Sequence, residues 1–309
     1  MATANDSTVV PTLRTFRPDG TTGIYAYYDG RTCPWHSSNW YDETLALGVA
    51  TYSIISGSTA VLFDAGLTPA HAAHMLAHVR SLGATTISTV YSHFHSDHVA
   101  GASALRETKI IAHKGTYDRL KKDEQKLRNP GKDEGPSIDV VLPMETYENS
   151  LSLQVGNIKV ELHNFQIHTT DSTLLFLPES GLVLAGDMLE DTVTYISEPQ
   201  DLHKHLRELE RMAQWPIKKI LPAHGSPDRI EAGGFDKSLI DATIRYLKAM
   251  DEPVEAPVAW IKKLDQVVKD DLVAGRLVYC DAYEGVHQEN IESMKDLREE
   301  TVGNLNTKS

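Results

Sequence analysis

The stretch that most constrains this chain is the twelve-residue run 90–101, VYSHFHSDHVAG, in which three histidines and an aspartate fall within six positions. The residues before it are typical of a strand, and the small residues after it can begin a helix. Side chains two apart in an extended chain point the same way, so His93 and His95 can present their imidazoles to one ion. Asp97 and His98 fall where the chain turns and can reach a second ion. Imidazole nitrogen and carboxylate oxygen are ligands that zinc and similar metals accept.

Three further residues supply what a two-metal site lacks, and each follows an apolar run that we predict to be a strand. His168 lies beyond the run 158–162, Asp187 follows 182–185, and His224 follows 219–221. Functional groups in sheet proteins gather at the carboxyl ends of strands. His163, five residues before His168, is the alternative ligand in that segment.

The expected chemistry follows from two sets of ligands joined by a bridging Asp187: His93, His95 and His168 for one ion, and Asp97, His98 and His224 for the other. Two ions about 3.5–4 Å apart can share a water whose pKa falls toward about 7, and the resulting hydroxide can attack a carbonyl. Asp97 can hydrogen-bond this hydroxide and pass its proton on, which makes Asp97 the candidate catalytic residue. Asp64, at a predicted strand end, is expected to orient a ligand histidine.

Size and charge limit the classes of partner. The chain has 309 residues and a formal net charge of −13, which argues against binding RNA or DNA because a polyanion needs a basic surface. No apolar run reaches the length of a membrane span, and the polar N-terminus lacks the pattern of a signal peptide. Cys33 and Cys280 form no disulfide framework. We therefore expect a cytoplasmic enzyme with a small-molecule substrate; the oligomeric state, a homodimer included, stays open.

The hydrophobic pattern predicts an α/β chain of the α+β type, in which strands cluster in two groups and each group is followed by helices. This order favours an αββα sandwich of two packed mixed β-sheets with helices on the outer faces. The predicted strands are 24–28, 50–55, 60–63, 87–91, 109–112, 151–155, 158–162, 173–177, 182–185 and 219–221. The predicted helices are 69–82, 115–127, 202–215, 238–250 and 257–269, and the tail from residue 291 is expected to fray.

Several segments leave two interpretations open. The loop 29–43 carries four bulky rings, which either cover the edge of the core or form a wall of a substrate pocket: Trp35, His36, Trp40 and Tyr41. The charged stretch 121–134 is either a solvated insertion or a mobile lid. The stretch 279–290 either packs a helix over the sandwich or closes one side of the pocket. A second group of histidines at helical spacing, which we expect at a solvent edge because no carboxylate accompanies it, comprises His71, His74 and His78.

The motif His93-Phe94-His95-Ser96-Asp97-His98, followed in order by His168, Asp187 and His224, resembles the metallo-β-lactamase fold superfamily over residues of about 23–230. The resemblance implies an αββα sandwich with a dinuclear, usually zinc, site at one edge. All seven ligand positions of the two-metal subfamilies are present, which disfavours a mononuclear iron dioxygenase. His95 stands where the flavodiiron pattern has a glutamate. On this basis we assign a polar arm to 1–20, the metallo-β-lactamase-like domain to 21–235 and a C-terminal helical extension packed on it to 236–309.

Two departures from the family pattern bear on the substrate. Ile167 and Asp171 stand where the family often has glycine. Lactonases that open acyl-homoserine lactones carry a tyrosine three residues past the bridging aspartate, where this chain has Glu190. Either the donor to the leaving group or the substrate therefore differs, and the candidates for contact near the metals, as opposed to plain surface residues, are Glu190, Asp191 and Tyr195.

Three hypotheses for the function follow. The first is a metal-dependent hydrolase that opens a small cyclic ester or amide, a lactone or lactam, or cleaves a related ester. The second is a thioesterase of the glyoxalase II or acyl-carrier type, which needs basic groups that are scarce around the motifs. The third is a non-catalytic binding module or a nucleic-acid processor on the same fold. The complete ligand set and the acidic balance count against the third.

Overall fold

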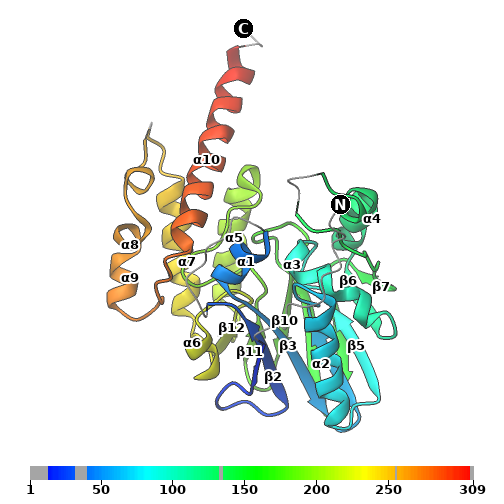
Figure 1. Ribbon diagram of the computed structural model, residues 1–309. Helices are drawn as coiled ribbons and strands as arrows, with labels where there is room; N and C mark the ends of the chain where they lie inside the picture. The colour runs from blue at the N-terminus through cyan, green and yellow to red at the C-terminus, as the bar shows by residue number, and fades with distance from the viewer. Residues whose placement is uncertain (1–12, 32–39, 132–134, 255, 307–309) are drawn as a thin grey trace.

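Two β-sheets lie face to face with helices on both outer sides in the computed structural model, which describes residues 13–31, 40–131, 135–254 and 256–306 (Figure 1). The predicted αββα sandwich of two mixed sheets is therefore confirmed. None of the helices in these ranges combines the length and apolarity needed to cross a bilayer.

The first sheet has its seven strands in chain order, so each strand pairs with its neighbour in sequence. Pairing is antiparallel from β1 to β4 and parallel from β4 to β7, where helices connect the strands. The strands are β1 Arg14–Phe16, β2 Ile24–Asp29, β3 Val49–Ser56, β4 Thr59–Phe63, β5 Thr86–Val90, β6 Lys109–His113 and β7 Glu145–Tyr147.

The second sheet has the order β12-β11-β10-β9-β8. Both hairpins that the alternating pattern predicts are present, β8 with β9 and β10 with β11, and only β11 and β12 pair in parallel. The strands are β8 Ser150–Val155, β9 Ile158–Asn164, β10 Thr173–Leu177, β11 Leu182–Leu184 and β12 Lys219–Leu221.

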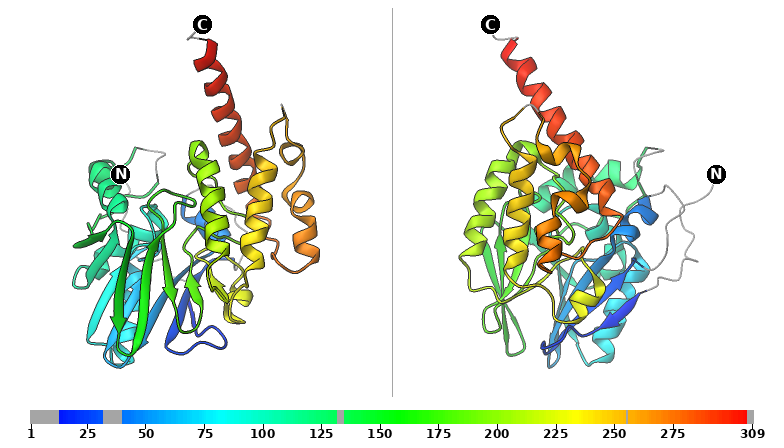
Figure 2. Two further views of the ribbon diagram at one scale, coloured as in Figure 1. Left: turned by 180° about the vertical axis from the view of Figure 1, so that it is seen from behind. Right: turned by 90° about the vertical axis from the view of Figure 1, so that its left-hand side faces the viewer.

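Helices α2 and α4 cover the first sheet, and α5 and α7 cover the second (Figure 2). The N-terminus of α2 forms as predicted, because the hydroxyl of Thr68 accepts a hydrogen bond from the His71 amide and Pro69 occupies the first turn. The helices are α1 Trp40–Leu47, α2 Pro69–Ser81, α3 Ser96–Val99, η1 Ala100–Leu105, α4 Lys114–Arg128, η2 Pro199–Asp201, α5 Leu202–Ala213, α6 Pro227–Glu231, α7 Ser238–Met250, η3 Val258–Ile261, α8 Leu264–Val267, α9 Lys269–Val273 and α10 Tyr283–Asn306.

Three buried clusters correspond to the three interfaces between layers. Alternation along β2 sends Tyr27 into the cluster under α2 and Tyr28 into the cluster between the sheets. The central cluster also takes Phe63 from the first sheet and Leu175 from the second. Each fully buried side chain of this size stabilises the fold by ~1.5–3 kcal/mol, so a strand shifted by one residue would lose several such contributions.

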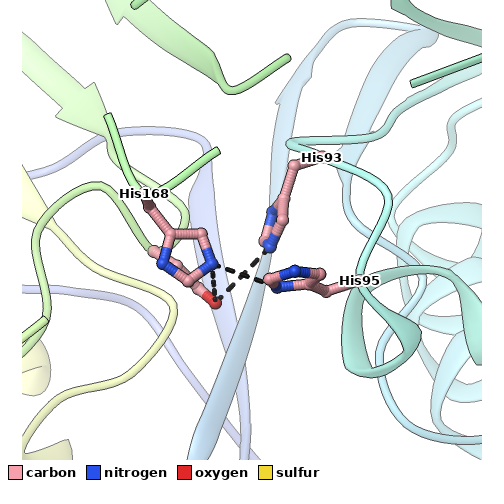
Figure 3. A group of neighbouring side chains, drawn as sticks. His93, His95 and His168 are labelled. Atoms are coloured by element: carbon pink, nitrogen blue, oxygen red, sulfur yellow. Dashed lines mark hydrogen bonds and ion pairs between the residues drawn. The ribbon is translucent and has the colours of Figure 1, made fainter. Parts of the chain in front are cut away.

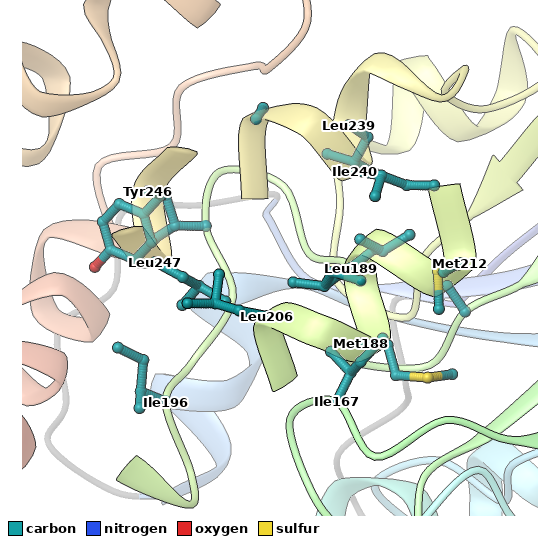
Figure 4. Packing of buried hydrophobic residues seen from close by; sticks show 14 of the residues in the cluster. Ile167, Met188, Leu189, Ile196, Leu206, Met212, Leu239, Ile240, Tyr246 and Leu247 are labelled. Atoms are coloured by element: carbon teal, nitrogen blue, oxygen red, sulfur yellow. The ribbon is translucent and has the colours of Figure 1, made fainter. Parts of the chain in front are cut away.

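The third cluster joins the second sheet to α5, α7 and the C-terminal helices. Figure 4 shows Leu189 in the middle of this cluster, Leu206 beside Leu247 on one side, and Leu239 and Ile240 together above it. Leu264, Tyr283 and Met294 belong to the same cluster (side chains from α8 and α10). The C-terminal extension therefore shares one core with the sandwich.

The single helix predicted for 257–269 is wrong. The structure has η3 and α8 there, separated by Lys262 and Lys263 in extended conformation, and α9 begins only at Lys269. Tertiary contacts hold the break: a carboxylate oxygen of Glu284 accepts a hydrogen bond from the Leu264 amide, and His287 contacts the Lys262 carbonyl.

The frayed tail predicted from residue 291 is also wrong, because α10 continues to Asn306 and projects beyond the body of the molecule (Figure 1). Ile291 and Met294 are buried, and Arg298 donates to the carbonyls of Glu252 and Val254. Its guanidinium carbon also lies 4.4 Å from the Trp260 ring. These contacts stabilise a helix that its polar sequence alone does not favour.

At the N-terminal side, two elements appear that the sequence did not predict. Residues 14–16, inside the expected polar arm, form the edge strand β1, and α1 begins within the loop expected at 29–43. In the stretch 121–134, residues up to Arg128 belong to α4, while 132–134 lie outside the described residues. Cys280 is a half-buried free thiol, and Cys33 lies outside the described residues.

The solvent edge predicted for the α2 histidines is wrong for His71, which is buried with its Nε2 2.7 Å from the Thr51 hydroxyl. His78 is half-buried, and its Nδ1 lies 2.8 Å from the Tyr27 hydroxyl. The face of α2 that carries these histidines packs on the first sheet, so a strand hydroxyl contacts one ring nitrogen of each imidazole.

Candidate metal centre

The histidine-rich run leaves the end of β5 and enters α3, as its sequence pattern predicts. His93 and His95 lie in the extended part, with ring centroids 4.5 Å apart, and His95 is the residue that precedes the helix. Asp97 and His98 occupy the first turn of α3. This short segment therefore presents four of the predicted ligands at one edge of the first sheet.

Three segments of the second sheet meet this run from the opposite side. His168 lies between β9 and β10, Asp187 follows β11, and His224 follows β12. Figure 3 shows His168 approaching from one side and His93 and His95 from the other, with imidazole nitrogens directed at a common point. All seven predicted ligands thus come together.

The close approach of these segments explains one glycine. Gly186, directly before Asp187, has φ +53°, and a Cβ built there would lie 3.0 Å from the Cβ of Ser92. A larger residue would be strained and would push the two loops apart. The Tyr28 hydroxyl donates to the Gly225 carbonyl at 2.9 Å and so fastens the His224 loop to the first sheet.

The first donor group comprises three histidines and Asp187. His168 Nε2 lies 3.0 Å from His95 Nδ1. Asp187 Oδ2 lies 3.6 Å from His93 Nε2 and 3.7 Å from His168 Nε2. The donor atoms therefore surround a single point.

The second donor group shares Asp187 with the first. Asp187 Oδ2 lies 3.1 Å from His98 Nε2 and 3.5 Å from His224 Nε2. Asp97 Oδ2 lies 3.1 Å from His224 Nε2 and 3.5 Å from His98 Nε2. One carboxylate oxygen of Asp187 thus stands between two sets of imidazole nitrogens.

These donor sets fit metal ions. Tetrahedral zinc with Zn–N bonds of about 2.0–2.1 Å needs donors roughly 3.3 Å apart, which is the range found in both groups. His93 Nε2 and Asp187 Oδ1 are buried without a hydrogen-bond partner among the described residues. Unpaired buried polar atoms are costly, and a cation between them would satisfy both.

The outward nitrogen of each histidine is also held, which turns the other nitrogen toward the centre. Such contacts fix the tautomer and the ring orientation of metal ligands. The partners and distances are His93 Nδ1 to Ser92 Oγ 2.9 Å, His95 Nε2 to Ser197 Oγ 3.3 Å, His98 Nδ1 to Asp64 Oδ2 2.9 Å, His168 Nδ1 to the Tyr195 carbonyl 3.1 Å, and His224 Nδ1 to the Gly48 carbonyl 2.6 Å.

Asp64 takes the position predicted for an orienting residue. Besides contacting His98, its Oδ1 accepts a hydrogen bond from the Ser92 amide at 2.6 Å. Asp64 and His168 have φ of +68° and +66°, a region that side-chain-bearing residues rarely adopt. Backbone strain of this kind persists where the surroundings hold it, and both residues belong to the centre.

Burial keeps three of the imidazoles neutral. It lowers the pKa of His95 to about 3 and places the pKa values of His93 and His168 below the ordinary histidine value. A neutral imidazole offers the lone pair that a metal needs.

The other two imidazoles lie among carboxylates. Burial acts to lower the pKa of His98 and His224, but Asp187 and Asp97 outweigh it and raise both pKa values. Burial acts to raise the pKa of Asp97 and Asp187, and the two histidines lower both pKa values. Protons thus supply positive charge between these groups, in the position that a cation would occupy.

Of the residues proposed to contact substrate, Glu190 and Asp191 turn inward. Glu190 is buried, and its oxygens accept hydrogen bonds from the Tyr195 amide and the Tyr283 hydroxyl. Asp191 is buried and accepts from the Val278 amide at 2.6 Å. Both residues therefore fasten the segment after Asp187 to the C-terminal extension, and a contact with substrate stays a prediction for them.

Tyr195 lies at the centre, with its half-buried ring 6.3 Å from the His168 ring. Trp40 and Tyr41 begin α1, whereas Trp35 and His36 lie outside the described residues. The alternative ligand His163 lies on β9 with its Nε2 3.1 Å from a Glu161 oxygen, and it belongs to neither donor group.

Several residues hold the donor histidines in a way that could not be predicted from the sequence. Gly48 and Tyr195 act through backbone carbonyls, which carry no signal in the side-chain sequence. Ser92, in contrast, is adjacent to His93, so its position beside the motif was a usable signal. Ser197 comes from a segment whose contact with His95 depends on the tertiary fold.

Comparison with known proteins agrees with this geometry. A family model described as the metallo-beta-lactamase superfamily matches residues 45–224, more than half of the chain. Among solved structures, a metallo-beta-lactamase from Pontibacter korlensis superposes with a TM-score of 0.59 and 17% identity, covering 76% of this chain and 99% of that chain. The DIM-1 metallo-beta-lactamase gives a TM-score of 0.54 and 18% identity, covering 76% of this chain and 96% of that chain. At these identities the structures show the fold alone.

Two curated relatives carry the name Beta-lactamase-like protein 2 homolog. The one from Drosophila melanogaster is 26% identical over 187 residues, covering 58% of this chain and 59% of its own length. The one from Caenorhabditis elegans is 25% identical over 182 residues, covering 58% of this chain and 56% of its own. The chain thus spans less than two thirds of the length of these relatives.

The match of the family model shows that the chain belongs to the metallo-beta-lactamase superfamily. Members of this superfamily are generally hydrolases, and the His/Asp cluster described above is compatible with metal binding.

Proposed function

We propose that this protein is a metal-dependent hydrolase that opens a small cyclic ester or amide, a lactone or lactam, or cleaves a related ester. The observation that carries the proposal is the pair of donor groups that share Asp187 at the meeting edge of the two sheets. Five imidazoles and two carboxylates at ligand distance form a far more specific arrangement than a polar cluster at the surface.

We further propose that the centre holds two ions, zinc by the nature of its donors. His93, His95 and His168 would hold one ion, and the second would bind the remaining set of Asp97, His98 and His224. Asp187 supports two ions rather than one, because its Oδ2 belongs to both groups and its Oδ1 is unpaired. When bound, such ions polarise a carbonyl oxygen and activate water for attack at neutral pH.

The chain's own groups supply the remaining steps. Asp97 has 17% of its side chain exposed, more than Asp187 or Asp64, so Asp97 is the carboxylate in reach of an incoming water. Its carboxylate can accept the proton of the attacking water and pass it to the leaving oxygen or nitrogen. Tyr195, half-buried beside His168, offers an apolar surface against which the substrate can pack.

The experiment is a metal analysis joined to a substrate panel. Purified protein should contain about two divalent ions per chain, and reconstitution of chelated protein should restore hydrolysis of at least one lactone, lactam or related ester. Hydrolysis of a thioester or a phosphodiester alone would support one of the other two hypotheses instead. His95→Ala should lose both metal and activity. Full activity in a metal-free preparation would overturn the proposal.

His163→Ala provides a matched control for His168→Ala. His163 belongs to the same segment but contacts Glu161 instead of the donor groups. We expect His168→Ala to bind less metal, while His163→Ala keeps the wild-type metal content and activity. Equal losses in the two variants would show that fold disruption, rather than ligand removal, is being measured.

A further inference from the structure

A small cavity lies beside the candidate metal centre, between α4 and the segment that follows His168. Its volume is about 200 Å³, and α4 forms one wall while residues 170 and 171 form the other. The lining residues are Gly115, Asp118, Arg119, Lys122, Thr170 and Asp171.

Two contacts connect this cavity to the centre. The Phe94 ring lies between them, with its centroid 4.6 Å from the His95 ring and 4.5 Å from the guanidinium carbon of Arg119. On the other side, the Thr170 amide donates to Glu198 at 2.9 Å, next to Ser197, which contacts His95. The cavity and the donor groups are therefore separated by the Phe94 ring, which contacts both His95 and Arg119.

The two walls of the cavity contact each other at one end, which should fix its shape. A Cβ on Gly115, at the start of α4, would lie 2.9 Å from the Cβ of Asp171. The Thr116 hydroxyl donates to Asp171 at 2.7 Å, which fixes the same contact. The two walls are thus held together at the N-terminal end of α4.

Both carboxylates of the cavity already accept hydrogen bonds from side chains of α4. Asp118 accepts from the Lys114 ammonium at 2.8 and 2.7 Å, and Asp171 accepts from Thr116. Neither set of hydrogen bonds involves Arg119 or Lys122.

The side chains of Arg119 and Lys122, in contrast, have N–H groups that are available to a ligand. The ion-pair partner of Arg119 is Glu198 at 3.9 Å, which is longer than a hydrogen bond. Lys122 makes no hydrogen bond or ion pair with any residue in the described ranges. Other basic side chains on α4 are paired: Lys114 with Asp118, Lys121 with Glu124, and Arg128 with Asp139.

We propose that Arg119 and Lys122 bind an anionic group, a carboxylate or a phosphate, at the far end of the substrate that the metal centre cleaves. This inference rests on the proposed hydrolase function and narrows its substrate class to acidic molecules. The planar guanidinium suits a carboxylate or phosphate, and its position over Phe94 fixes its plane. In a chain of net charge −13, an acidic substrate needs such a local positive site to approach.

The test compares Arg119→Ala/Lys122→Ala with the matched control Lys121→Ala/Lys126→Ala, which removes two charges from the same helix outside the cavity. The substrates are 4-nitrophenyl butyrate and mono-4-nitrophenyl glutarate, which share the scissile ester and differ by a terminal carboxylate. We expect the KM for the glutarate ester to rise about tenfold in the first variant, with the butyrate ester and the control unchanged. Equal changes for both esters, or no change, would overturn the inference.

Binding measurements separate this inference from the hydrolase proposal. Calorimetric titration of metal-free protein with glutarate and with inorganic phosphate should show about tenfold weaker binding in the first variant than in wild type and control. The tighter of the two probes identifies the anion as carboxylate or phosphate. If binding weakens but no ester is hydrolysed, the anion site stands and the hydrolase proposal fails; if esters are hydrolysed but binding and KM are unchanged, the anion site fails.

Discussion

Two groups of three histidines in this chain have similar composition and opposite roles. His93, His95 and His98 direct nitrogens toward shared points and meet carboxylates there. The α2 histidines each contact a different hydroxyl: His71 that of Thr51, His74 that of Thr15, and His78 that of Tyr27. The density of histidine is therefore a poor guide to a metal site. What distinguishes the first group is convergence on Asp187, because a buried imidazole nitrogen without a partner occurs in both groups, at His93 and at His71.

The difference follows from the elements that carry the two groups. An extended segment that turns into a short helix aims His93, His95 and His98 at one place, where three further segments end. A regular helix sets His71, His74 and His78 one turn apart along a line, so each imidazole reaches a different strand residue. The helix thus spreads its histidines, while the loop gathers them.

The largest expected effect comes from removing the shared carboxylate. Asp187→Asn keeps the size of the side chain but removes the charge that both donor groups use. We expect the protein to lose most of its metal and its kcat/KM to fall by about 10³-fold or more, because metal activation is worth several kcal/mol. Metal analysis and steady-state kinetics measure the two losses. His71→Gln, from the other histidine group, should retain the metal. A comparable loss of metal in His71→Gln would mean that the two histidine groups do not differ in metal binding.

A smaller effect is expected from Asp64, which contacts His98 from behind. Asp64→Asn should weaken metal binding about 10- to 100-fold while leaving the seven ligands in place. Competition with a chromophoric chelator gives the affinity, and excess metal should restore much of the activity. Activity that stays lost at saturating metal would mean that Asp64 does more than orient His98.

Sequence was sufficient to find the seven residues of the donor groups for a physical reason. His93, His95, Asp97 and His98 are close in the chain, so local geometry brings them together, and each remaining ligand follows a recognisable apolar strand. For such a motif, the sequence alone indicates that the side chains can meet at one place.

Sequence was insufficient where the tertiary fold makes the contact. Gly48 holds His224 through a backbone carbonyl, and Glu190 is turned inward by Tyr283 from α10. Basic residues looked scarce around the motifs because Arg119 is distant in the chain, yet α4 places it over Phe94. The helix in the polar tail was not predicted, because few apolar residues, Ile291 and Met294 among them, mark its buried face.

His71, in the α2 group of histidines, should make the free energy of unfolding depend on pH. Burial lowers the pKa of His71 to about 3, against about 6.5 in the unfolded chain. Because the folded pKa is depressed, the stability is complete above about pH 6.5 and is lost as pH falls toward 3. At pH 5 this histidine alone should account for a loss of ~2 kcal/mol.

His71→Gln removes the titration and keeps a polar group near Thr51. Urea unfolding of chelated protein should find the variant less stable at pH 7.5 by ~1 kcal/mol, from the altered hydrogen bond. The gap should close or reverse at pH 5. A gap that is the same at both pH values would show that His71 does not set the acid sensitivity.

The smallest effect is expected at His74, which is exposed and has its Nε2 2.7 Å from the Thr15 hydroxyl on the edge strand β1. His74→Ala should cost ~0.5 kcal/mol or less, because water replaces an exposed hydrogen bond at little cost. The change should be local: amide exchange should rise at residues 14–16 and stay unchanged in β3. Metal content should also be unchanged, since His74 belongs to neither donor group in the part of the chain that the structure describes. If His74→Ala released metal, convergence on a carboxylate would no longer separate the two histidine groups.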